Sequence, residues 1–304
     1  MKILLTGAAG FLGRHLYQEL CIGNDVIGTV RHVAGEHDNP YVEIPISPST
    51  NWKPVLSEIN CVVHSAALAH VFNANGCSLE QFRMINTLST LNFAEQAASS
   101  GIKRFIFISS IGVNGLGSVK PIRFDDAANP QEPYAVSKYE AEVGLQKIEK
   151  ETGMEVVIIR PPLVYGANAP GNFGKFCALA KMNLPLPLGA IDNKRSLVGI
   201  DNLVDLITTC IDHPKAANQT FLVSDDDDVS TSHLLRSMIL SAGKTPFLLP
   251  VPISILRFFA DLLGKASVID RMSSNLQIDI SHTKSTLGWK PPVSFEKGIR
   301  RCFK

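Results

Sequence analysis

The stretch that decides the fold opens the chain: Lys2-Ile-Leu-Leu-Thr-Gly-Ala-Ala-Gly-Phe-Leu-Gly13. A short apolar run breaks into glycines and then continues with apolar residues at helical spacing, which predicts a strand, a tight turn and a helix. The first glycine allows a turn that other residues resist, the second lets a ligand approach the backbone, and the third lets the helix lie close to the strand. The N–H groups of the first helical turn then suit a pyrophosphate. The residues predicted to hold a dinucleotide here are Gly7, Gly10, Phe11, Leu12 and Gly13.

Length and composition set the broad class of the protein. The 304 residues are enough for a large core and about two domains. A net charge of +1 offers no electrostatic argument for nucleic acid or an anionic membrane as partner. No apolar run approaches the roughly eighteen residues of a membrane span, and the six scattered cysteines lack metal-ligand spacing. We therefore expect a cytoplasmic protein with free thiols, no bound metal and no signal peptide.

The next strand is predicted at 25–30 and ends at Arg31. In dinucleotide folds the end of this strand faces the adenosine ribose, and NAD sites place a carboxylate there. That carboxylate is missing, whereas the Arg31 guanidinium could pair with a 2′-phosphate. NADP is therefore favoured over NAD, although the polar loop at 31–37 also permits a solvated arginine. A later strand runs into Ala66 and Ala67, small residues that would let the cofactor lie across the sheet edge.

The segment Glu132-Pro-Tyr-Ala-Val-Ser-Lys-Tyr-Glu140 carries the candidate chemistry. Tyr134 and Lys138 are four residues apart, so on a helix both point to one face. An ammonium beside a phenol favours the phenolate and would lower the tyrosine pKa from about 10 towards neutrality. Tyr134 could then act as a general acid or base. A lone Tyr-x-x-x-Lys is common on helices, but here it follows the glycine turn and a strand ending in Ser109-Ser110, and precedes a strand at 154–159.

Together these motifs resemble the extended short-chain dehydrogenase/reductase family, in particular its nucleotide-sugar epimerases, dehydratases and reductases. The resemblance covers essentially all of the chain. It rests on Gly7-x-x-Gly10-x-x-Gly13, His64-x-Ala66-Ala67, Asn86, Ser110, Tyr134-x-x-x-Lys138, Arg160-Pro-Pro-x-Val-Tyr-Gly166 and the tail Leu287 to Phe295. It implies an α/β fold with a Rossmann-type doubly wound parallel sheet in residues 1–166. A smaller C-terminal α/β lobe in residues 167–304 would bind the nucleotide sugar, with some of its segments returning to the sheet.

The resemblance also implies roles for four residues of the catalytic centre. Tyr134 would be the acid/base, and Lys138 would hold the nicotinamide ribose and tune the tyrosine. Ser110 would form a hydrogen bond with the reacting sugar oxygen, and Asn86 would complete a proton relay.

On the substrate side, the resemblance assigns the nucleotide diphosphate to Arg195, which starts a predicted strand, and a nucleotide contact to Asn172. A surface arginine is the alternative for Arg195. Two positions depart from the family pattern. Pro45-Ile46 replaces an acidic residue that contacts adenine, and Asn114 replaces a tyrosine beside the substrate.

Three other segments in the chain have structural interpretations. The acidic run Asp225 to Asp228 lies between a predicted strand and helix, and because four consecutive carboxylates cannot converge on one ion, we expect a solvated loop. The apolar segment Phe247 to Leu263 carries little positive charge on its polar face, so we expect a buried or subunit-contacting helix rather than a membrane-surface helix. The resembling enzymes dimerise through two long helices, here 79–100 and 134–150, so a homodimer is expected.

The function favoured by these observations is an NADP-dependent reductase acting at C4 of a nucleotide-linked 4-keto sugar, plausibly a UDP-linked 4-keto-6-deoxy-N-acetylhexosamine. The alternative is a 4-epimerase of a UDP-hexose or UDP-N-acetylhexosamine that retains NAD. A dehydratase is disfavoured because Ile111-Gly112 occupies the positions of that group's acidic pair. A non-catalytic NADP-binding regulator is a remote alternative, since the Tyr134/Lys138 pair is intact. Fold alone would not decide among these.

Overall fold

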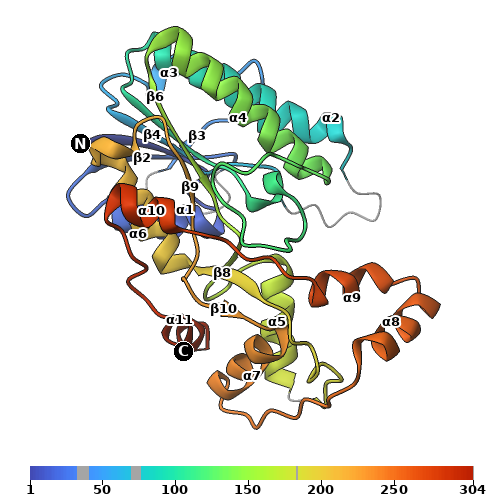
Figure 1. Ribbon diagram of the computed structural model, residues 1–304. Helices are drawn as coiled ribbons and strands as arrows, with labels where there is room; N and C mark the ends of the chain where they lie inside the picture. The colour runs from blue at the N-terminus through green and yellow to red at the C-terminus, as the bar shows by residue number, and fades with distance from the viewer. Residues whose placement is uncertain (33–40, 70–76, 183, 304) are drawn as a thin grey trace.

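The computed structural model describes residues 1–32, 41–69, 77–182 and 184–303. A seven-stranded parallel sheet forms the larger lobe, in the order β3-β2-β1-β4-β5-β6-β9 (Figure 1). Its strands are β1 (Lys2–Thr6), β2 (Asp25–Val30), β3 (Val42–Glu43), β4 (Cys61–His64), β5 (Arg104–Ile108), β6 (Glu155–Arg160) and β9 (Thr220–Leu222). The order reverses direction beside β1, as in doubly wound dinucleotide folds. The predicted α/β fold is confirmed.

Helices cover both faces of this sheet, which explains why its central strands are apolar throughout. In β5, Phe105 and Phe107 join the core beneath one helical layer, while Ile106 and Ile108 join the core beneath the other. The first layer holds α2 (Leu79–Phe82), α3 (Ser89–Ser99) and α4 (Pro133–Thr152), and the second holds α1 (Phe11–Leu20), α6 (Ile200–Asp212) and α10 (Ser281–Leu287).

The predicted helix at 79–100 is interrupted in the structure. Between α2 and α3 the backbone follows a π-helix at Arg83–Leu88 (η2). Short 3-10 helices lie at Lys53–Val55 (η1), Ile111–Asn114 (η3) and Pro214–Ala216 (η4). In the part of the chain that the structure describes, no helix has the length and apolar character needed to cross a membrane.

The smaller lobe is built on a mixed three-stranded sheet. Strand β8 (Arg195–Gly199) pairs in parallel with β7 (Leu163–Tyr165) and antiparallel with β10 (Asp228–Val229). The helices of this lobe are α5 (Gly171–Met182), α7 (Thr231–Ser241), α8 (Ile253–Leu262), α9 (Ala266–Ser273) and α11 (Phe295–Arg301). The chain returns to the large sheet at β9. The division at residue 166 stays a prediction.

The acidic run after β9 differs from the solvated loop expected from the sequence. Asp225 is buried and accepts hydrogen bonds from the Tyr165 hydroxyl (2.6 Å), the Gly199 N–H (2.8 Å) and the Asn202 amide (2.6 Å). These three donors satisfy the carboxylate that burial would otherwise destabilise. Asp225 thus joins β7, β8 and α6, and no group of metal-ligating side chains is found among the described residues.

Candidate active site

The glycine turn between β1 and α1 has the shape that a dinucleotide needs. Gly7 has φ +72°, and a Cβ on it would lie 2.9 Å from the Ala66 Cα. A Cβ on Gly13 would lie 2.0 Å from the Gly7 carbonyl oxygen, and one on Gly10 would lie 3.1 Å from it. Gly10 caps α1 without a side-chain hydrogen bond, so the N–H groups at the start of the helix face outward uncapped. The residues present therefore fit a bound pyrophosphate.

The ends of β1 and β4 are joined beside this turn by a buried histidine. His64 forms hydrogen bonds through both ring nitrogens, to Thr6 Oγ1 (2.7 Å) and Thr90 Oγ1 (3.0 Å). Burial, together with the charge of Lys138, lowers the pKa of His64 to about 3. The imidazole is therefore neutral and structural, and it fixes the strand that leads into Ala66 and Ala67.

Helix α4 presents the predicted catalytic pair. It begins at Pro133, so Tyr134 lies in its first turn and Lys138 one turn later. The Lys138 ammonium is buried, donates a hydrogen bond to the Ile108 carbonyl (2.8 Å) and lies 4.4 Å from the centre of the Phe107 ring. Burial lowers the pKa of Lys138 to about 7, although the charge of Glu142 opposes that shift.

The expected lowering of the tyrosine pKa is wrong for the chain alone. Burial raises the pKa of Tyr134 to about 12. The physical reason is that burial of the phenol outweighs any stabilisation of the phenolate, because the hydrogen bond that the structure describes for the Lys138 ammonium goes to β5.

Ser110 lies where β5 ends and caps the short helix η3. Its Oγ accepts a hydrogen bond from the Gly112 N–H (3.1 Å), which leaves its own hydroxyl proton available to a ligand. The neighbouring Ser109 is buried, and its Oγ has no hydrogen-bond partner among the described residues. The double serine predicted from the sequence therefore has one hydroxyl oriented by the loop and one buried at the strand end.

Asn86 lies in the π-helical turn and is buried. Its Oδ1 accepts from the Leu68 N–H (2.8 Å), and its Nδ2 donates to the Leu68 carbonyl (3.1 Å) and to Ser137 Oγ (3.0 Å). These contacts connect the loop after β4 to α4, immediately before Lys138. The proposed part of Asn86 in a proton relay stays a prediction.

A buried ion pair between α4 and β6 was not predicted. Arg160 Nη2 lies 2.6 Å from Glu142 Oε2, and both side chains are less than a tenth exposed. Arg160 Nη1 also donates to Asn114 Oδ1 (3.1 Å), and Asn114 Nδ2 donates to the Asp126 carbonyl (3.4 Å). Asn114, which departs from the family pattern, therefore ties the loop after Ser110 to β6. The sequence carried one signal for this pair. Glu142 follows Lys138 by four residues, so on a helix the two side chains lie on the same face.

Arg195 begins β8 and is connected to the start of α4 through α9. Its Nη1 donates to the carbonyls of Arg271 (2.8 Å) and Ser274 (3.1 Å), and burial lowers its pKa. The Arg271 guanidinium in turn forms an ion pair with Glu132, the residue before α4. The tertiary structure thus brings two arginines of the small lobe to the end of α4 that carries Tyr134.

Two predicted ligand residues are more exposed. Arg31 follows the last residue of β2, and Asn172 lies in the first turn of α5. Residues 33–37 of the loop after Arg31 lie outside the described residues. Among the described residues, the Arg31 side chain has no ion pair and the Asn172 side chain has no hydrogen bond, so both can meet a ligand.

A model of the NAD dependent epimerase/dehydratase family matches residues 3–224. The chain belongs to this family. It is 47% identical over 307 residues to a UDP-glucose 4-epimerase of Vibrio cholerae, an alignment that covers 99% of this chain and 94% of the relative. A UDP-N-acetylglucosamine 4-epimerase from Bacillus cereus has a similar structure, with 19% identity, a TM-score of 0.83 and coverage of 100% and 98%. A UDP-glucuronic acid 4-epimerase from Bacillus cereus in complex with NAD has 21% identity, a TM-score of 0.80 and coverage of 100% and 96%.

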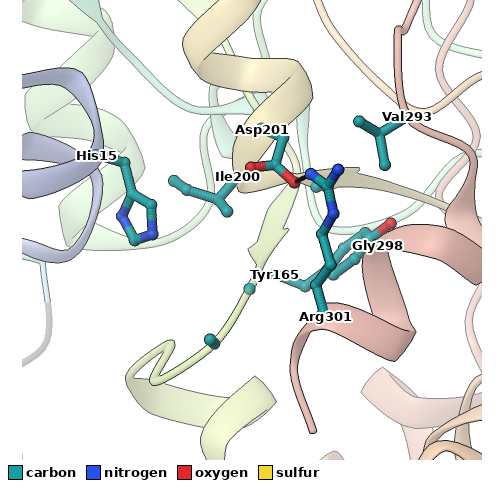
Figure 2. A pocket seen from close by; sticks show the side chains of 10 residues that line it. His15, Tyr165, Ile200, Asp201, Val293, Gly298 and Arg301 are labelled. Atoms are coloured by element: carbon teal, nitrogen blue, oxygen red, sulfur yellow. Dashed lines mark hydrogen bonds and ion pairs between the residues drawn. The ribbon is translucent and has the colours of Figure 1, made fainter. Parts of the chain in front are cut away.

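This epimerase/dehydratase family member is an enzyme of the extended short-chain dehydrogenase/reductase type that uses a nicotinamide cofactor. Its structure also contains a pocket of about 120 Å³ where the two lobes meet, which no proposed catalytic residue lines. Figure 2 shows His15 of α1 on one side of this pocket and the Asp201–Arg301 ion pair on the other. The sequence did not indicate it, because its lining comes from segments far apart in the chain.

Proposed function

We propose that this enzyme is a UDP-sugar 4-epimerase that retains NAD and acts on a UDP-hexose or a UDP-N-acetylhexosamine. The observation that carries the proposal is the 47% identity, over nearly the whole of both chains, to a UDP-glucose 4-epimerase. The arrangement of Lys138 and Ser110 at the carboxyl end of β5, with Tyr134 one turn before Lys138 on α4, suits this reaction and the second candidate below equally. The proposal reverses the order of the two functions favoured by the sequence alone.

Each residue of the centre has one task in this proposal. Tyr134, ionised as the phenolate, accepts the proton of the sugar C4 hydroxyl and later returns it. The positive charge of a bound nicotinamide ring would favour this phenolate against the burial that raises the Tyr134 pKa in the chain alone. Ser110 donates a hydrogen bond to the same oxygen, because its Oγ accepts rather than donates in the bond with Gly112. When bound, NAD would accept a hydride from C4 and return it to either face of the sugar. The residues proposed to hold it are Gly7, Gly10, Phe11, Leu12, Gly13, Ala66, Ala67, Tyr134 and Lys138.

The substrate diphosphate is assigned to Arg195, supported by Asn172 at the nucleotide. Arg195 uses one nitrogen for the two backbone carbonyls, so its remaining N–H groups can reach phosphate oxygens. Its partial burial strengthens such charge-assisted hydrogen bonds.

A second candidate is the NADP-dependent reduction of a UDP-linked 4-keto-6-deoxy-N-acetylhexosamine. The observation that favours it is Arg31, an exposed cation directly after β2, where an NAD site places a carboxylate. In that reaction Tyr134 would donate its proton to the C4 oxygen.

Two measurements on the purified enzyme distinguish the 4-epimerase from the NADP-dependent reductase. Mass spectrometry of the nucleotide released on denaturation should detect NAD, and incubation with UDP-N-acetylglucosamine or UDP-glucose should yield the C4 epimer without added cofactor. Bound NADP, together with loss of reduced-nicotinamide absorbance when NADPH and the 4-keto sugar are supplied, would establish the reductase instead.

We also propose a homodimer. The helices expected at its interface expose Met84, Leu88 and Val143, each close to half exposed, on η2 and α4. Analytical ultracentrifugation should therefore give twice the mass of the chain. A cytoplasmic location stays a prediction.

A further inference from the structure

The two hydroxyls proposed to act on the sugar come from different elements. Ser110 is the residue before η3, and Tyr134 lies in the first turn of α4. Both must reach the same C4 oxygen, and a displacement of about 1 Å between groups that act together can slow a reaction on the order of a hundredfold. The contacts that set η3 against α4 therefore bear on the rate of the proposed reaction.

Backbone contacts hold the start of η3. The Ile111 N–H donates to the Pro161 carbonyl, directly after β6 (2.9 Å). A Cβ on Gly112 would lie 3.3 Å from the Ala135 Cβ and 3.3 Å from Ser110 Oγ. Helix η3 therefore lies in close contact with the first turn of α4, with no room for a side chain between them.

The other end of η3 is held by the side chain of its last residue, Asn114. Its Oδ1 accepts from Arg160 Nη1 (3.1 Å), and its Nδ2 donates to the Asp126 carbonyl in the segment that leads into α4 (3.4 Å). Arg160 is itself fixed, because its Nε and Nη2 donate to the two carboxylate oxygens of Glu142 (3.0 and 2.6 Å). Since Glu142 lies on α4, a continuous series of hydrogen bonds runs from η3 through β6 to the helix of Tyr134.

The chemistry of an amide suits this position. A guanidinium only donates hydrogen bonds and a backbone carbonyl only accepts them, so a residue between the two must accept on one side and donate on the other. A leucine of similar size can do neither, and a carboxylate can only accept. Because both ends of its amide are engaged by Arg160 and by the Asp126 carbonyl, Asn114 acts on its neighbours in the protein.

We propose that Asn114 is a positioning residue, which through Arg160 and Glu142 holds Ser110 in place for the reaction at C4. The inference rests on the proposed function, in which Ser110 and Tyr134 serve the same sugar oxygen. It applies to epimerisation and to reduction alike, because both reactions need the two hydroxyls together. Asn114 is only partly buried, so replacing it disturbs the fold less than replacing Glu142.

Steady-state kinetics of the full-length enzyme, with the nucleotide it retains on purification, test this proposal. N114L should lower kcat for C4 epimerisation about thirtyfold and leave KM for the UDP-sugar within about threefold, because the diphosphate contact is untouched. N114D keeps an oxygen that accepts from Arg160, so its kcat should return to within about fivefold of the wild type. An N114D variant as slow as N114L would overturn the proposed route through Arg160.

A double-mutant cycle with S110A separates positioning from general damage. In the S110A background, N114L should lower kcat by less than about threefold further, because the hydroxyl that Asn114 holds in place is absent. Equal losses from N114L in the two backgrounds, or an N114L variant with the kcat of the wild type, would overturn the proposal.

The matched control is N60L. The Asn60 side-chain oxygen accepts from the Lys2 N–H (2.8 Å), but it lies at the amino ends of the strands, opposite Ser110, so kcat should equal that of the wild type. Unchanged melting temperatures would show that the variants fold.

Hydrogen–deuterium exchange distinguishes a failure of this inference from a failure of the proposed function, since it needs no substrate. N114L, but not N60L, should raise exchange in residues 110–116, because η3 loses its side-chain contact with β6. An unchanged exchange rate there would overturn the inference. A raised rate in an enzyme that converts no UDP-sugar would instead overturn the proposed function and leave the contact of Asn114 with η3 and β6 supported.

Discussion

The two lobes differ in how completely they bury their elements. Strands β4 and β5 of the large sheet are buried at every residue, and α4 alone contributes seven buried side chains. In the small lobe, β10 buries one residue, and α8 and α9 bury none. Elements with few buried contacts unfold locally at a lower free-energy cost than elements whose two faces are both covered by a core. The proposed chemistry therefore rests on the more deeply buried lobe, while the proposed substrate contact Arg195 starts β8, the best buried strand of the small lobe.

The largest expected effect of a substitution is at Tyr134 in the large lobe. Y134F keeps the ring and removes the hydroxyl, so kcat for the 4-epimerase reaction should fall about a thousandfold, within the range for general acid–base catalysis. The melting temperature should remain unchanged, and the nucleotide released on denaturation should still be NAD, because the other proposed cofactor contacts are intact. Turnover within tenfold of the wild type would show that another group moves the proton.

The buried pair behind α4 should dominate stability. E142Q removes the carboxylate from a side-chain pair that is 2% and 8% exposed and leaves Arg160 uncompensated, which should lower the free energy of unfolding in urea by about 3–5 kcal/mol. E140Q is the matched control on the same helix. Its pair with Arg83 is 31% and 42% exposed, so the change should be below about 1 kcal/mol. If E142Q and E140Q lowered the free energy of unfolding equally, the difference in burial between the two ion pairs would not explain their contributions to stability.

In the small lobe, the expected effect is on binding rather than on turnover. R195A should raise KM for the UDP-sugar about ten- to a hundredfold, as the loss of a charge-assisted hydrogen bond predicts, with little change in kcat. K194A, at the exposed neighbouring residue, should leave both constants unchanged. A fall in kcat alone for R195A would place this arginine in the chemistry instead of in binding.

The smallest effect is a dependence of stability on pH that comes from Lys138. Its pKa is about 7 in the folded chain and about 10.4 when unfolded. Between these values the unfolded state binds more protons, so the free energy of unfolding rises with pH, by at most about 1.4 kcal/mol per pH unit. Urea titrations at pH 7, 8 and 9 should show this rise in the wild type and a smaller one in K138M. If the free energy of unfolding changed with pH equally in the wild type and in K138M, Lys138 would keep its proton in the folded state.

Local patterns were enough to predict the backbone features on which most of the candidate site residues lie. The glycine turn, the strand ends at Ala66 and Ser110, and the helical spacing of Tyr134 and Lys138 depend on residues close together in the chain. Backbone sterics and helix geometry act over such distances. The order of the two functions could not be predicted in this way, because reductases and epimerases of this family share these motifs.

Contacts between distant residues could not be predicted. The Arg160–Glu142–Asn114 cluster joins β6, α4 and the loop after Ser110, and the ion pair of Glu132 with Arg271 joins the two lobes. In the chain alone, desolvation of the partly buried Tyr134 raises its pKa, so an argument from Lys138 alone assigned the wrong direction. Asp225 was similarly misjudged, because its three donors come from β7, β8 and α6.

By itself, the sequence determined the α/β class, the glycine turn and the placement of Tyr134 and Lys138 one turn apart on a helix, since each depends on the torsions and periodicity of a short segment. Only the tertiary structure decided which charges are buried, how the small lobe reaches α4, and that the aromatic side of α8 faces outward. The physical reason is that burial is a property of all the elements around a side chain. An amphipathic pattern states that a helix has an apolar side, but its neighbours decide whether that side is covered.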